Sequence, residues 1–235
     1  MPTKTSKRSG KQRVAILISG RGSNMAALIR AAKAKNYPAQ TALVVSNEPK
    51  AEGLKHARRA GILTATIDHR PFGKNRGKFE RALHAELKRH DIDIVCLAGF
   101  MRLLTPWFVG KWNGRLLNIH PALLPAFKGL DTHARALAAG VKIHGATVHF
   151  VVPEMDSGPI IAQAAVPVFS KDTPATLAAR VIKVEHRIYP VALRIVAERR
   201  AGNVKRPRYQ RRAEDRQRTH RAKSSQRSSK NKTPG

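Results

Sequence analysis

The chain has 235 residues, a formal net charge of +30 and a single cysteine. This length is enough for one domain with a sizeable hydrophobic core, and one cysteine excludes an intrachain disulfide. The polar, basic N-terminus has no apolar segment like that of a secretory signal, and no apolar run is long enough to span a membrane. We therefore expect a cytoplasmic protein without a membrane contact.

The positive charge is concentrated at the two ends of the chain. Residues 199–235 contain 14 Lys and Arg against two acidic residues, and residues 1–13 contain five more basic residues. Because both ends are nearly free of large apolar side chains, they cannot bury enough surface to offset the entropy lost on ordering. We predict a disordered basic arm at 1–12, one folded domain at 13–200 and a disordered basic tail at 201–235. Contact of this tail with nucleic acid would be non-specific.

The predicted domain begins with a strand, a glycine-rich turn and a helix. Residues 14–18 are an unbroken aliphatic run, typical of a buried parallel strand, and Ser-Gly-Arg-Gly-Ser-Asn precedes a helical pattern at 25–34. Such a turn offers backbone N–H groups and the positive end of a helix dipole to an anion such as phosphate. Met25 replaces the third glycine of a dinucleotide fingerprint, which disfavours a dinucleotide site. A tight turn without a ligand is the alternative.

Strands and helices alternate along the rest of the chain. Further strands are predicted at 41–45, 63–67, 94–98, 115–119, 146–152 and 160–169, and helices at 51–60 and 78–89. The last helix has Thr173 as its predicted N-cap and Pro174 at its first position, and Pro190 is expected to kink or interrupt it. Cys96 is predicted to be a packed core residue. This order predicts an α/β domain with a Rossmann-like, mostly parallel sheet and helices on both faces.

A second polar group of residues lies later in the chain. Asn118 and His120 are two positions apart in an apolar run, so on a strand their side chains leave the same face. Asp156 follows within Glu-Met-Asp-Ser-Gly-Pro. An amide donor, an imidazole that transfers a proton and a carboxylate that orients it suit acyl transfer without a metal. A turn at a strand end with a hydrogen-bonded histidine is the alternative, because Asn-x-His alone is a weak pattern.

The polar motifs follow predicted strands, and ligands of open α/β sheets bind beyond the carboxyl ends of the strands. Other histidines are nearby in the sequence. His144 and His149 are predicted to be structural, with a position facing the cleft as the alternative for His149, and His133 is predicted to line the pocket.

Seven segments carry a resemblance to a known family. They are 18–24 (Ile-Ser-Gly-Arg-Gly-Ser-Asn), 45–47 (Val-Ser-Asn), 97–104 (Leu-Ala-Gly-Phe-Met-Arg-Leu-Leu), 117–121 (Leu-Asn-Ile-His-Pro), 144–150 (His-Gly-Ala-Thr-Val-His-Phe), 156–159 (Asp-Ser-Gly-Pro) and 185–190 (Glu-His-Arg-Ile-Tyr-Pro). In this order they resemble the glycinamide ribonucleotide formyltransferases, the folate-dependent enzymes of purine synthesis. The resemblance covers about residues 14–197.

The resemblance implies a reaction and a set of residues for it. Family members transfer the formyl group of 10-formyltetrahydrofolate, a co-substrate, to glycinamide ribonucleotide without a metal. The implied catalytic residues are Asn118, His120 and Asp156. The implied substrate-binding residues are Gly22, Ser23, Asn24, Met25, Ala26 and Glu185. The implied folate-binding residues are Arg76, Met101, Arg102, Leu103, Leu104, Val152 and Glu154, together with Asn118 and Asp156.

The chain departs from the family pattern near the implied catalytic residues. Ala122 stands where the family usually has Ser, Lys128 stands where it has Pro before Gly129, and Ser157 stands where glycine is frequent. These departures leave the shape of the loop at 122–133 open.

Other functions share some of these motifs. The tRNA and sugar formyltransferases and the formyltetrahydrofolate deformylases contain His-Pro and Asp-x-Gly-Pro in looser form. We expect a further folded domain in the tRNA enzymes and the deformylases, and both ends of this chain are too short and polar for one. From another class, a basic nucleic-acid-binding protein on an inactive enzyme scaffold is the alternative.

Overall fold

The computed structural model of the chain describes residues 10–202. The chain divides into two units, Met1–Glu198 and Arg199–Gly235, and the sheet belongs to the first unit. The predicted disordered arm and tail lie almost entirely outside the described range. The first strand begins at Gln12, just before the predicted start of the domain.

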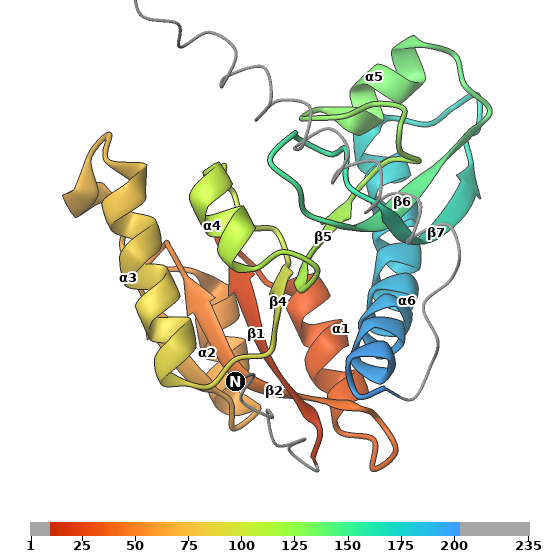
Figure 1. Cartoon of the computed structure of the whole chain (residues 1–235). Helices are drawn as coiled ribbons and strands as arrows, with labels where there is room; N and C mark the ends of the chain where they lie inside the picture. Colours follow the sequence, from red (N-terminus) through yellow and green to blue (C-terminus); the bar gives the residue numbers. More distant parts are fainter. Residues whose placement is uncertain (1–9, 203–235) are drawn as a thin grey trace, which may run out of the picture. The chain divides into compact units, whose positions relative to one another are not determined.

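The described residues form a seven-stranded sheet with the order β3-β2-β1-β4-β5-β6-β7 (Figure 1). The strands are β1 (Gln12–Ile18), β2 (Ala39–Ser46), β3 (Leu63–Thr66), β4 (Ile94–Leu97), β5 (Leu116–His120), β6 (Ile143–Phe150) and β7 (Ile160–Pro167). β1 to β5 pair in parallel, whereas β6 is antiparallel to both β5 and β7. The mostly parallel sheet predicted from the sequence is confirmed. Because β1 pairs with both β2 and β4, the chain reverses its direction of winding at β1, where open sheets bind ligands.

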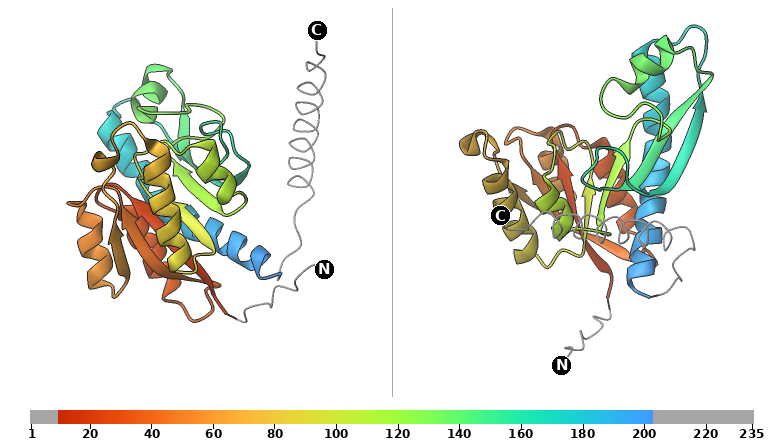
Figure 2. Two further views of the ribbon diagram at one scale, coloured as in Figure 1. Left: turned by 60° about the vertical axis from the view of Figure 1, so that its left-hand side comes forward. Right: turned by 45° about the horizontal axis from the view of Figure 1, so that its top comes forward.

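Helices cover both faces of the sheet, as predicted (Figure 2). They are α1 (Ser23–Ala32), α2 (Glu52–Arg59), α3 (Arg76–Arg89), α4 (Pro106–Lys111), α5 (Thr132–Ala138) and α6 (Pro174–Arg200), with a 3₁₀ turn at Arg70–Phe72. Alternate residues of β1 enter two cores: Val14, Ile16 and Ile18 pack with α1, α2 and α6, while Ala15 and Leu17 pack with α3 and α4. The sequence did not predict α4 and α5, because both are too short to display a helical period.

The last helix corrects one prediction. Thr173 caps it as predicted, since its hydroxyl accepts a hydrogen bond from the Thr176 N–H at 3.3 Å. Of the two effects expected of Pro190, an interruption is wrong, because α6 continues to Arg200, whereas a kink stays a prediction. Tyr189 and Leu193 on either side of the proline are buried against the sheet, and this packing outweighs the backbone hydrogen bond that proline cannot donate.

The Tyr189 hydroxyl connects α6 to β4 and β5, and it gives a test of this packing. It donates to the Leu97 carbonyl at 2.9 Å and lies 3.3 Å from the Leu117 carbonyl, and the residue is fully buried. We expect Tyr189→Phe to lower the free energy of unfolding by about 1–2 kcal/mol, because buried acceptors lose their donor. Urea denaturation monitored by circular dichroism measures this difference, and an unchanged midpoint would contradict it.

Candidate active site

Two of the three predicted catalytic side chains come from one face of β5. Asn118 and His120 are alternate residues of this strand, and His120 is almost completely buried. His120 Nε2 lies 2.9 Å from the Phe127 carbonyl oxygen, which can only accept, so Nε2 carries a hydrogen. The other ring nitrogen, Nδ1, lies 3.4 Å from Asp156 Oδ2. A hydrogen on Nδ1 would therefore face the Asp156 carboxylate.

Asp156 reaches this position from the loop between β6 and β7. Its backbone has a positive φ of 50°, which Asp tolerates better than most residues, and the Gly129 N–H donates to its Oδ2 at 2.9 Å. Gly158 closes the same loop, where an added Cβ would lie 1.7 Å from the Phe150 carbonyl oxygen. No larger residue fits there, which explains the glycine of Asp-Ser-Gly-Pro. The structure thus brings Asp156 to Asn118 and His120, as the sequence predicted.

His149 contacts two of these residues, which agrees with the position facing the cleft that the sequence left as its alternative. It lies opposite Asn118 in the β5–β6 ladder. Its Nδ1 is 2.9 Å from the Phe150 carbonyl, and its Nε2 is 3.3 Å from Asn118 Nδ2 and 3.7 Å from Asp156 Oδ1. Burial lowers the pKa of His149, although the Phe150 carbonyl and Asp156 oppose this shift. A neutral ring with hydrogen on Nδ1 accepts at Nε2, so His149 orients the Asn118 amide.

The two remaining histidines of this region contact each other. His144 is buried in β6, and its ring lies 5.3 Å from that of His133 and 5.8 Å from that of Phe127, in edge-to-face contacts. The predicted structural role of His144 agrees with this packing. His133 packs on His144, so its predicted place in the pocket stays a prediction.

The glycine-rich turn after β1 has the geometry of an anion site. Gly22 has a φ of 76°, and a Cβ there would approach Met25 Cε to 2.9 Å and the Gly53 Cα to 3.2 Å. Helix α1 begins at Ser23, directly after this turn. The first N–H groups of a helix have no acceptor within the helix, so those of Ser23, Asn24 and Met25 can bind a phosphate.

Helix α6 adds the predicted acidic residue to this turn. Asn24 Nδ2 donates to Glu185 Oε2 at 2.6 Å, although the two residues are far apart in the sequence. Burial raises the pKa of Glu185, while the hydrogen bond from Asn24 and the nearby His120 imidazole lower it. The turn follows β1 and His120 ends β5, and the strands from β1 through β4 to β5 pair in parallel, so the turn, Glu185 and His120 lie at the same edge of the sheet. Asn24 Oδ1 is buried and has no hydrogen-bond partner among the described residues.

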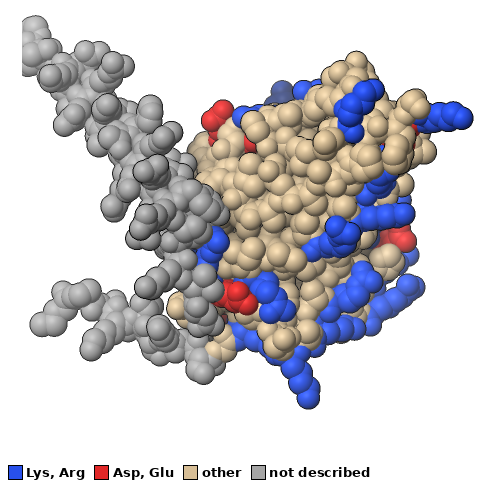
Figure 3. Space-filling model, turned by 90° about the vertical axis from the view of Figure 1, so that its right-hand side faces the viewer, with Lys and Arg blue, Asp and Glu red and all other residues tan. Residues whose placement is uncertain are grey.

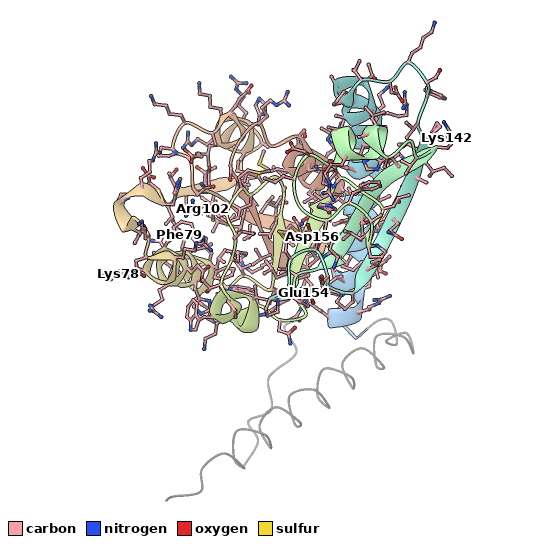
Figure 4. The ribbon with its side chains drawn as sticks, turned by 90° about the horizontal axis from the view of Figure 1, so that it is seen from above. Lys78, Phe79, Arg102, Lys142, Glu154 and Asp156 are labelled. Atoms are coloured by element: carbon pink, nitrogen blue, oxygen red, sulfur yellow. The ribbon has the colours of Figure 1, made fainter. Side chains whose placement is uncertain are left out.

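The predicted folate-binding residues come from three places. The segment at 101–104 follows β4 and is fixed to the end of β1, because the Met101 N–H donates to Ser19 Oγ at 2.8 Å. Its Met101 and Leu103 side chains are exposed apolar groups. Val152 and Glu154 lie in the same loop as Asp156, between β6 and β7; Glu154, Asp156 and Arg102 can be found by their labels in Figure 4. Arg76 is exposed at the first residue of α3, a different element from those of the catalytic group. Their roles in binding stay predictions.

A cavity, a metal-binding group and a membrane-spanning helix are three further features that would bear on function within residues 10–202. A cavity of about 430 Å³ between β3 and the C-terminal end of α3 contains none of the predicted site residues. No group of three or more His, Cys, Asp or Glu side chains within residues 10–202 could hold a metal ion. In the same range, no helix has the length and apolar character needed to cross a membrane.

Comparisons with known proteins place the chain in a family. The model of the formyl transferase family matches residues 12–193, which is more than half of the chain. The chain belongs to the formyl transferase family. The matched residues include β1, the glycine turn, the three predicted catalytic residues and Glu185.

Relatives of this formyl transferase are close in sequence and structure. The phosphoribosylglycinamide formyltransferase of Escherichia coli (strain K12) is 46% identical over 187 residues, which cover 80% of this chain and 88% of that protein. The human trifunctional purine biosynthetic protein adenosine-3 is 54% identical over 187 residues, but this chain spans only 18% of its length. The crystal structure of phosphoribosylglycinamide formyltransferase from Brucella melitensis, 53% identical, has a TM-score of 0.76 and covers 80% of this chain and 96% of that chain.

Proposed function

We propose that this chain transfers the formyl group of 10-formyltetrahydrofolate to the amine of glycinamide ribonucleotide, giving N-formylglycinamide ribonucleotide and tetrahydrofolate in purine synthesis. The convergence of Asn118, His120 and Asp156 is the main support, since His120 Nδ1 and Asp156 Oδ2 are 3.4 Å apart. The name and the 88% coverage of the Escherichia coli relative support the same reaction. The matched segment is only 18–19% of the trifunctional relatives, so only this one activity is proposed for the chain.

The reaction requires placement of two substrates and control of charge. The neutral amine attacks the formyl carbon, and a tetrahedral intermediate forms with a negative oxygen and a positive nitrogen. One proton then moves from this nitrogen to N10 of the folate, and the bond between N10 and the formyl carbon breaks. The protein must therefore stabilise an oxyanion and provide a path for one proton.

The catalytic group offers both functions. His149 occupies one hydrogen of the Asn118 amide, which leaves the second hydrogen for the oxyanion. The Nδ1–H of a protonated His120, whose nitrogen lies a long 3.4 Å from Asp156 Oδ2, is a further donor that the oxyanion can share with this carboxylate, and each well-placed donor contributes about 10²–10³ in rate. Asp156 stabilises the positive charge on His120 and accepts the proton on its way from the amine to N10.

The glycine turn and Glu185 suit the other end of the substrate. The N–H groups at the start of α1 bind the phosphate of glycinamide ribonucleotide, and Asn24 Oδ1, a buried acceptor, is available to a ribose hydroxyl. Residues 10–202 contain 30 Lys and Arg against 13 Asp and Glu, and Figure 3 shows basic side chains distributed over one face. This excess attracts anionic substrates over distances longer than a hydrogen bond.

A direct assay tests the proposed function. The purified full chain and a chain shortened to end at Arg200 are each incubated with glycinamide ribonucleotide and 10-formyltetrahydrofolate, and mass spectrometry follows the formylated product. We expect equal activity from both, because the catalytic group lies outside the basic tail at 201–235. Formylation of methionyl-tRNA or an amino sugar in place of glycinamide ribonucleotide would overturn the proposal. A cytoplasmic location and non-specific binding of the tail to nucleic acid stay predictions.

A further inference from the structure

Two loops meet beside the catalytic group through a pair of side chains. Lys128, in the loop between β5 and α5, donates from Nζ to the Ser157 Oγ at 2.6 Å, and Ser157 lies in the loop between β6 and β7. We call this hydrogen bond the Lys128–Ser157 clasp. The hydrogen bond links the loop that follows β5 to the loop that contains Asp156.

The clasp is placed between the two backbone groups that hold the catalytic side chains. The carbonyl of Phe127, the residue before Lys128, binds His120 at 2.9 Å. The N–H of Gly129, the residue after Lys128, binds Asp156 at 2.9 Å. A shift of the backbone at Lys128 would therefore displace both the Phe127 carbonyl, which binds His120, and the Gly129 N–H, which binds Asp156.

Other contacts make both ends of the clasp rigid. Arg135 Nη1 donates to the Lys128 carbonyl at 2.6 Å, and the Ser157 hydroxyl donates to the Met155 carbonyl at 3.0 Å. Phe127 and Asp156, which flank the clasp, have positive φ angles of 53° and 50°. Such angles in residues other than glycine persist only where surrounding contacts hold them.

We propose that Lys128 and Ser157 are positioning residues that keep His120 and Asp156 at the separation needed for proton transfer. They do not touch the reacting atoms, and they act through Phe127 and Gly129. The inference rests on the proposed function, because it concerns the rate of the same formyl transfer.

A double-mutant cycle in the full chain tests the proposal. We expect Lys128→Met and Ser157→Ala each to lower kcat about fivefold, equivalent to about 1 kcal/mol, with the KM for glycinamide ribonucleotide unchanged. The double variant should lose no more than either single variant, because the two residues form one interaction. Lys128→Arg, which keeps a charged donor, should recover most of the activity. Lys142→Met is the matched control, since Lys142 is exposed and well away from Asp156 in Figure 4.

The outcomes separate this inference from the proposed function. If the chain without substitutions does not formylate glycinamide ribonucleotide, the proposed function is wrong. An active unchanged chain with full activity in both single variants, or with losses that multiply in the double variant, overturns the clasp. Circular dichroism shows whether Lys128→Met folds. If it does not, Ser157→Ala is compared with Ser157→Thr, which keeps the hydroxyl, and a loss of kcat only in Ser157→Ala supports the clasp. A higher KM at unchanged kcat also contradicts a positioning role.

Discussion

Replacing His120 with alanine is expected to lower kcat for formyl transfer by about 10³-fold, with little change in the KM for glycinamide ribonucleotide. The imidazole is the only group of the catalytic trio that can both donate to the oxyanion and transfer a proton at neutral pH. Its ring nitrogens face the Phe127 carbonyl and Asp156, so the alanine variant leaves both of these groups without their imidazole partner. Steady-state kinetics with saturating folate measures the loss.

The loss must be separated from damage to the fold, because His120 is buried and its removal leaves the Phe127 carbonyl without its donor. Thermal unfolding of the variant provides this check. Added imidazole should restore part of the activity, since it fits the space that the side chain leaves. His56→Ala is the matched control, because His56 is partly exposed on α2 and pairs only weakly with Glu52 at 3.6 Å. A kcat within tenfold of that of the chain without substitutions would contradict a catalytic role for His120.

The sequence predicted the parts of the site that depend on periodicity. Asn118 and His120 share a face because side chains alternate on a strand, and this holds whichever strand lies beside them. The turn at Gly22 was predictable because only glycine tolerates its φ and the close approach of Met25. Cys96 was predictable as a core residue from the aliphatic run around it.

The features that the sequence did not predict depend on the pairing of strands, on loop conformation and on the packing of α6. His149 faces Asn118 only because β6 is antiparallel to β5 in one register, and a shift by one residue would turn its side chain to the other face. The loop after β5 contains Phe127 with a positive φ of 53°, and this residue type does not predict such a conformation. An interruption of α6 was expected at Pro190 from the missing N–H of proline, but the helix continues because the neighbours of Pro190 are buried.

The charge of Asp156, and not its hydrogen-bonding shape, is expected to matter for the reaction. Asp156→Asn should lower kcat by about 10²–10³-fold, because the amide cannot stabilise a positive imidazole or accept the proton. The substitution keeps the shape of the side chain, an oxygen for the Gly129 N–H and a residue that tolerates a φ of 50°. Single-turnover formyl transfer, measured by rapid quenching, separates this chemical effect from product release.

Asp131→Asn is a close control for this prediction. Asp131 also has a positive φ, of 55°, and lies at the start of α5 beside the same loop, but it is exposed. The same loss of one negative charge and the same change of side chain should therefore leave kcat within about twofold, because an exposed charge is screened by solvent. Equal losses in both variants would attribute the effect to the general charge of the region. Unchanged single-turnover rates in Asp156→Asn would assign the proton path to His120 and solvent, and Asp156 would then only orient the ring.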